Sequence, residues 1–329
     1  MPTPAPQQPA PQPPKVATKI NRMGLAGLVK GRQAHPTRVL LYGPEGVGKS
    51  TFAASAPAPI FLGAEEGTAQ LDVTRFPQPE TWPDASDAID TLINETHEFK
   101  TLVIDTLDWM EPLMWDFICQ RDSAGRKDKL TTIEDYGYGK GYQVALDEWR
   151  KFLASLERLR KAKPMHVVML AHSWIKPFKN PEEGGDFDRY ELKINNKAAG
   201  LVKEWNDAVL FARYETYAVK DKDTKRVRGV DNNGARIVRT ERRAAYDAKN
   251  RYGLPEQMPL SWDEFMKGVE ASQPADPTQL LAAIKERATM LGGELEKATL
   301  AAIERAGGDA VKLAQLADWA LGKLQQKEN

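Results

Sequence analysis

Short apolar runs alternate with stretches of helical periodicity over most of the chain. The apolar runs, rich in Val, Ile and Leu, are residues 39–42, 60–62, 102–104 and 166–171. Between them, apolar residues with helical spacing favour helices at 49–56, 84–95, 107–120 and 140–162. Apolar strands that alternate with helices are typical of a mostly parallel sheet covered by helices, so the pattern predicts an α/β fold.

The pattern changes after Trp205. Residues 207–219 and 236–246 alternate between apolar and polar positions, on either side of a polar segment that contains Gly and Asn. Such alternation is typical of strands with one solvated face. It predicts an antiparallel extension of the sheet.

Composition divides the chain into four parts. Residues 1–19 are rich in Pro, Gln and Ala, which predicts a disordered tail, and residues 20–269 hold the α/β core. A short Pro-containing linker is expected at 270–277. Residues 278–329 are rich in Ala, Leu, Glu and Lys and are interrupted by two Gly-Gly pairs, so they predict a small C-terminal helical module.

Charge and cysteine content exclude several classes of protein. The 329 residues include 46 Lys and Arg against 46 Asp and Glu, so any contact with nucleic acid has to be local. The single cysteine, Cys119, excludes a disulfide framework, and with four scattered histidines it excludes the usual Cys/His zinc arrangements. We find neither the apolar core of a signal peptide nor a run that could span a bilayer, so we expect a cytoplasmic protein without membrane contact.

One segment matches the phosphate-binding pattern G-x-x-x-x-G-K-[ST] between a strand and a helix. Its residues are Gly43, Pro44, Glu45, Gly46, Val47, Gly48, Lys49, Ser50 and Thr51. Successive backbone N–H groups of such a loop, together with the N-terminus of the following helix, hold phosphate oxygens. We expect Lys49 to reach the β- and γ-phosphates of ATP and Ser50 to ligate Mg²⁺.

Acidic residues stand where two further apolar runs end. Asp105 follows residues 101–104, and a carboxylate at that edge of a sheet can hold Mg²⁺ beside Ser50. Asp108 is interpreted as an acid at a helix N-terminus without a metal role. Glu65 and Glu66 follow the run at 60–62, and either of them can act as the general base for the attacking water. Solvated loop acids are the alternative.

His172 follows the apolar run at 166–171. A polar side chain at that edge can sense the γ-phosphate and pass the signal to the next loop. A purely structural histidine is the alternative. His166, at the other end of the same run, is given no role.

The order of these motifs resembles the RecA-like P-loop NTPase core. It resembles more closely the phage-encoded RecA-like ATPases of the single-strand annealing and recombination group, over about residues 37–268. Segments 203–212 and 246–255 also look like recurring segments of that group. The resemblance implies a homo-oligomer with ATP at subunit boundaries, in the cytoplasm of a host cell. It further implies that Arg251 reaches the γ-phosphate of a neighbouring subunit, for which a surface basic pair with Lys249 is the alternative.

Two segments are candidates for contact with single-stranded DNA. Residues 213–251 hold twelve Lys and Arg against six Asp and Glu, with tyrosines interspersed, and such a surface suits phosphates and stacked bases. The second candidate is the loop expected at about 173–196, which contains Trp174 and Lys176. An ordinary β-hairpin would have a similar sequence there.

These observations favour a Mg²⁺-dependent ATPase that binds single-stranded DNA and assists phage recombination or annealing. A single-strand-binding protein is a candidate partner. The alternative is an ATP-dependent loader or remodeller of a replication protein, in which the C-terminal helices would form a lid. A small-molecule kinase is the least favoured function, because it leaves the basic segment unexplained.

Overall fold

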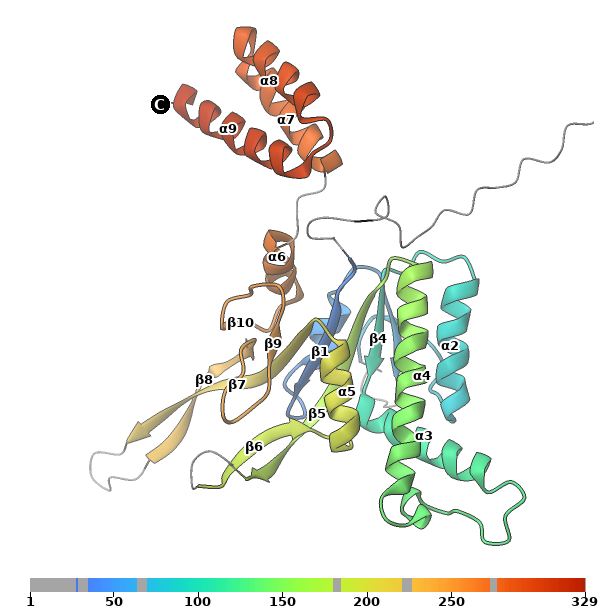
Figure 1. Ribbon diagram of the computed structural model, residues 1–329. Coiled ribbons are helices and arrows are strands. Elements are labelled where there is room, and N and C mark those ends of the chain that lie inside the picture. Colours follow the sequence, from blue (N-terminus) through green and yellow to red (C-terminus); the bar gives the residue numbers. More distant parts are fainter. Residues whose placement is uncertain are drawn as a thin grey trace, which may run out of the picture. The chain divides into compact units, whose positions relative to one another are not determined.

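The computed structural model describes residues 28, 35–63, 70–179, 185–220, 227–272 and 277–328, and a mixed sheet forms its centre (Figure 1). The strand order is β10-β8-β7-β1-β5-β4-β2-β3. The parallel strands are β1 (Arg38–Gly43), β2 (Pro59–Gly63), β3 (Thr74–Arg75), β4 (Thr101–Asp105), the first half of β5 (His166–Phe178) and β7 (Ala208–Lys220). The predicted α/β fold with a mostly parallel sheet is thus confirmed, and β3 is an addition to it.

Strand β5 changes partner at His172. Up to that residue β5 pairs with β1, and from Ser173 onward it pairs antiparallel with β6 (Phe187–Leu192). The segment expected as a loop after His172 is therefore a β-hairpin that continues directly from the core strand.

The antiparallel extension is present, but its second strand differs from the prediction. Strand β8 is Val227–Arg239, whereas the alternation predicts 236–246. It pairs with β7, and the short strands β9 (Lys249–Asn250) and β10 (Gln257–Pro259) complete this side of the sheet. Tyr246 lies in a turn, and its ring stacks on Phe211 in the core.

Helices cover both faces of the sheet. Both faces are apolar, because successive residues of β1 belong in turn to two different hydrophobic clusters. Leu40 and Tyr42 belong to the cluster under four helices, whereas Val39 and Leu41 belong to the cluster on the opposite face. The first face is covered by α2 (Trp82–Asn94), α3 (Leu107–Asp122), α4 (Lys140–Ala162) and α5 (Asn196–Trp205). The second face is covered by α1 (Lys49–Ala54) and α6 (Trp262–Ser272).

The C-terminal segment forms three helices with a small core of their own. They are α7 (Pro277–Leu291), α8 (Gly293–Ala306) and α9 (Ala310–Glu328), and Ile284, Ala306 and Leu313 are buried among them. Gly307 ends α8 with a φ of 57°, a left-handed conformation that glycine adopts without strain. In the parts of the chain that the structure describes, no helix has the length and apolar character needed to cross a membrane.

Candidate nucleotide site

The loop between β1 and α1 has the geometry of a phosphate-binding loop. Gly43 has no room for a side chain, because a Cβ there would lie 2.3 Å from the carbonyl oxygen of Ala212 on β7. Gly48 has a φ of 100°, which a residue with a Cβ rarely adopts. The Lys49 ammonium donates to the carbonyl oxygens of Gly43 and Pro44 at 3.3 and 3.0 Å, and its residue is 5% exposed. A buried cation is thus held within the loop.

The two residues predicted to hold Mg²⁺ lie in contact. Ser50 Oγ donates a hydrogen bond of 2.7 Å to Asp105 Oδ2, and Asp105 ends the buried strand β4. In the described residues no group of three or more His, Cys, Asp or Glu could hold a metal ion by itself. A hydroxyl and one carboxylate still suit Mg²⁺, which keeps several waters and takes its remaining ligands from phosphates.

His172 is held beside this loop by Asp108. The register of β1 and β5 places His172 opposite Gly43. Asp108 Oδ1 accepts a hydrogen bond of 2.9 Å from the backbone N–H of His172, and its Oδ2 lies 2.8 Å from Nδ1 of the same residue. Burial raises the pKa of Asp108, but the hydrogen bonds from His172 outweigh burial and leave the pKa below its usual value. Asp108 lies in the first turn of α3, as the sequence predicts, and it is also a positioning residue for His172.

Two residues of the β7–β8 hairpin complete the site, although the sequence predicts both on a DNA surface. Tyr214 Oη donates a hydrogen bond of 2.9 Å to the carbonyl oxygen of Gly46. Arg236, opposite Tyr214 in the β7–β8 ladder, places its Nη1 2.8 Å from where a Cβ of Gly48 would be. Its guanidinium lies over the Tyr214 ring at 5.8 Å.

Several of these groups line one hollow of about 370 Å³. Its walls are formed by Gly46, Gly48, Lys49, Ser50, Thr51, Gln70, Leu71, Asp105, Thr106, His172 and Arg236. The hollow is of the size that small-molecule sites have. It brings the cations, the hydroxyl–carboxylate pair and the histidine together, as binding of a nucleoside triphosphate requires.

The remaining predicted site residues do not line this hollow among the described parts of the chain. Glu65 and Glu66 fall in 64–69, outside the described residues, so their role stays a prediction. Arg251 lies by the start of β7, whereas the phosphate-binding loop follows the other end of the neighbouring parallel strand β1. Arg251 donates a hydrogen bond of 2.9 Å to Asp207. Lys249 donates to the carbonyl oxygens of residues 203, 204 and 206, and so ties down the end of α5. Arg251 thus has no part in the phosphate site of its own chain, and action on a neighbouring subunit stays a prediction.

The described part of the basic segment 213–251 uses many of its cations internally. Arg239 and Arg243 both pair with Glu256, at 3.6 and 2.5 Å. Tyr246, expected on the surface, is 6% exposed. The side chains of 217–231, which include the basic cluster of the hairpin tip, lie outside the described residues.

A family model described as an AAA domain matches residues 35–252, more than half of the chain. No curated protein matches. Among solved structures, the chain is similar to the crystal structure of the RadB recombinase, with 11% identity, 65% of this chain and 90% of that chain covered, and a TM-score of 0.33. With its phosphate-binding loop, its Ser50–Asp105 pair and a family match that covers every strand of the sheet except β10, the chain belongs to the AAA domain family.

Proposed function

We propose that this chain is a Mg²⁺-dependent ATPase that binds single-stranded DNA and assists phage recombination or annealing as a homo-oligomer. The observation that carries the proposal is the convergence of Lys49, the Ser50–Asp105 pair and the His172–Asp108 pair on one hollow. The first two features serve phosphate binding and the third connects that site to the β5–β6 hairpin.

The residues of the hollow divide the work of hydrolysis. Lys49 places a positive charge on the β- and γ-phosphates, and Ser50 with Asp105 holds Mg²⁺, which neutralises charge on the same oxygens when bound. Arg236 adds a second cation on the solvent side of the loop. Glu65 or Glu66 orients and deprotonates the attacking water.

Coupling to DNA rests on the continuity of β5. His172 pairs with the phosphate loop, and the next residue, Ser173, already belongs to the hairpin with β6. A contact between His172 and the γ-phosphate therefore biases a hairpin that projects from the core, because a strand transmits a displacement along its own backbone.

The experiment that tests this function is ATP turnover by the full chain, with and without single-stranded DNA, combined with the anisotropy of a labelled strand. We expect hydrolysis that requires Mg²⁺ and is stimulated by single strands. The AAA domain match keeps a loader or remodeller of a replication protein as the second candidate. If DNA does not change the rate of ATP hydrolysis and the strand binds in no nucleotide state, the second function is favoured.

Replacing Glu65 and Glu66 together by Gln is expected to preserve ATP binding and to reduce turnover by roughly 10²–10⁴-fold. Amides keep the size of the two side chains and remove both the base and the charge. The measurement pairs the steady-state rate with the affinity for a fluorescent ATP analogue. Glu80→Gln is the matched control, because it also replaces a negatively charged glutamate by glutamine, at an exposed position. A normal rate in the double variant assigns the base to another residue.

Replacing Arg236 by Ala is expected to lower kcat/KM for ATP by about ten- to a hundredfold, because we expect Arg236 to donate a charge-assisted hydrogen bond to a phosphate and alanine cannot do so. Arg158→Ala serves as the control, since this arginine forms only a surface ion pair with Asp90 among the described residues. The fold is monitored by the melting temperature. Unchanged kinetics would place Arg236 outside the catalytic machinery.

A further inference from the structure

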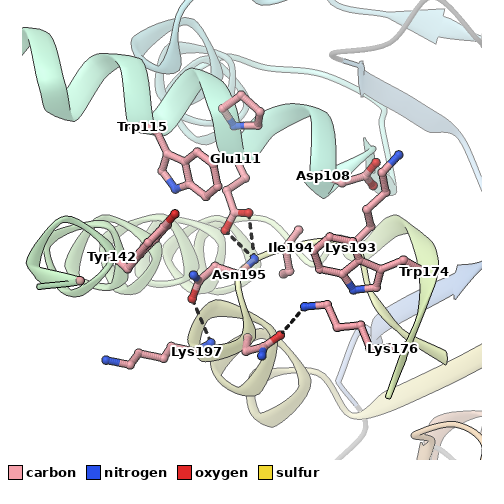
Figure 2. Close-up of a pocket in the computed structure, with 13 residues that line it drawn as sticks. Asp108, Glu111, Trp115, Tyr142, Trp174, Lys176, Lys193, Ile194, Asn195 and Lys197 are labelled. Carbon is pink, nitrogen blue, oxygen red and sulfur yellow. Dashed lines mark hydrogen bonds between the residues drawn. The ribbon is translucent and has the colours of Figure 1, made fainter. Parts of the chain in front are cut away.

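A second cavity, of about 560 Å³, lies at the root of the β5–β6 hairpin (Figure 2). Its walls come from α3, the start of α4, the hairpin and the segment that leads into α5. Asp108 belongs to this wall, and the same side chain holds His172 at the nucleotide hollow. The two cavities therefore share a structural element.

Aromatic rings line opposite sides of this cavity. Trp115 and Tyr142 meet edge to face, with ring centroids 5.6 Å apart and planes at 75°. Trp174 projects from the hairpin on the other side, as Figure 2 shows, and is 39% exposed. The Nε1–H of Trp115 is buried and finds no hydrogen-bond acceptor among the described residues. A ligand that enters here meets flat apolar surfaces.

Lysines surround the aromatic rings. Lys176 Nζ lies over the Trp174 ring at 3.7 Å from its centroid, and Lys193 and Lys197 also line the cavity. Lys193 Nζ reaches within 3.9 Å of Glu45 in the phosphate-binding loop. Burial raises the pKa of Glu111, the carboxyl group in the wall, to about 7 despite the hydrogen bond from Asn195, which lessens its repulsion of an anion. Three lysines outnumber the two carboxyl groups of the wall, Asp108 and Glu111, so the surroundings suit an anionic ligand.

Amide groups stand at the polar end of the cavity. The Asn195 backbone N–H donates to the Glu111 carboxylate at 2.9 and 3.2 Å, which fixes the segment before α5. Asn195 Oδ1 accepts from the Lys197 N–H and Asn196 Oδ1 accepts from Lys176, each at 3.0 Å. Both side-chain oxygens thus accept hydrogen bonds, and each side chain also carries an Nδ2 group, which can donate to carbonyl or ring-nitrogen acceptors.

We propose that this cavity holds one unstacked base of a single DNA strand, with the flanking phosphates on Lys176, Lys193 and Lys197. The proposal rests on the proposed function, since it names the place where that strand is read. Aromatic faces stack bases of any sequence, amide donors meet their carbonyl groups, and lysines neutralise the backbone. Through Asp108 and Lys193 an occupied cavity contacts both His172 and Glu45, so the base also reports to the nucleotide site.

The binding test compares oligothymidine with an oligomer of the same length whose sugars carry no bases. We expect the full chain with a non-hydrolysable ATP analogue to prefer oligothymidine by about tenfold or more. Trp174→Ala should remove most of that preference. Two controls should retain it: Trp319→Ala, an indole of similar exposure in α9, and Ile175→Ala, on the opposite face of the same strand.

Salt dependence and photochemistry test the same site independently. Replacing Lys193 and Lys197 by Gln should reduce the slope of log affinity against log salt by about 0.7 for each phosphate that is no longer neutralised, whereas Lys161→Gln, exposed at the end of α4, should not. A strand that carries 5-iodouracil should crosslink the wild-type protein at Trp115, Tyr142 or Trp174. Mass spectrometry identifies the crosslinked residue.

The outcomes separate this proposal from the proposed function. If the strand binds and stimulates hydrolysis while the variants match wild type and crosslinks fall elsewhere, the cavity assignment is wrong and the function stands. If the strand does not bind in any nucleotide state, the DNA part of the function fails and the cavity assignment fails with it. Capture of an acidic aromatic peptide at Trp174, without competition by oligothymidine, would overturn the base site in favour of a protein partner.

Discussion

Lys49→Ala is expected to abolish measurable ATP hydrolysis, with a loss of at least roughly 10²–10³-fold in turnover and a large loss of affinity for ATP. The side chain is the buried cation inside the phosphate-binding loop, where its Nζ lies on the carbonyl oxygens of Gly43 and Pro44. Removal of a preorganised charge from developing negative charge has an effect of about this size. Turnover and binding of a fluorescent ATP analogue are the two measurements.

The control for this variant is Lys161→Ala, an exposed lysine at the end of α4. Both variants should show the circular dichroism of the wild type, because the hydrogen bonds of Lys49 Nζ to Gly43 and Pro44 lie within the phosphate-binding loop. Near-normal turnover of Lys49→Ala in a folded protein would contradict the phosphate assignment, and with it the whole nucleotide site.

Asp105→Asn is expected to reduce Mg²⁺-dependent turnover by roughly 10²–10³-fold. The amide oxygen can still accept the hydrogen bond from Ser50, so the local geometry is retained while the negative charge that attracts the cation is removed. The required concentration of Mg²⁺ should rise, and binding of ATP without Mg²⁺ should change little. A titration of the rate against Mg²⁺ at fixed ATP measures this separation.

Asp116→Asn, at an exposed position on α3, provides the matched control for loss of one carboxylate. Because Asp105 is buried, the loss of its charge could also alter stability, and thermal melting of both variants measures that effect separately. If Asp105→Asn keeps the wild-type dependence on Mg²⁺, then the Ser50–Asp105 contact is a structural hydrogen bond and the metal is held elsewhere.

The hairpin after His172 illustrates how far sequence patterns reach. Apolar and aromatic residues stand on both sides of a Gly-containing centre, which is compatible with two strands of a hairpin. A long loop can have the same composition. Pairing of Ser173 with Leu192 settles the matter, because strand pairing is a contact between segments that local periodicity cannot specify. The displacement of β8 has the same cause: residues 227–231 and 236–239 pair with β7, and the polar residues between them, with positive φ at Asn233 and Gly234, form an irregularity in the ladder rather than the hairpin turn.

Local features of this protein follow from the sequence by itself, because they depend on neighbours along the chain. The phosphate-binding loop, the buried strands and the helix breaks at the Gly-Gly pairs are of this kind. Contacts between distant segments were decided only by tertiary structure. Asp108 meets His172 across 64 positions, and Tyr214 meets Gly46 across 168, since adjacent strands bring their ends to one edge of the sheet. Arg236 reaches the nucleotide hollow for the same reason: the direction of a side chain from a strand depends on the register with its partner strand.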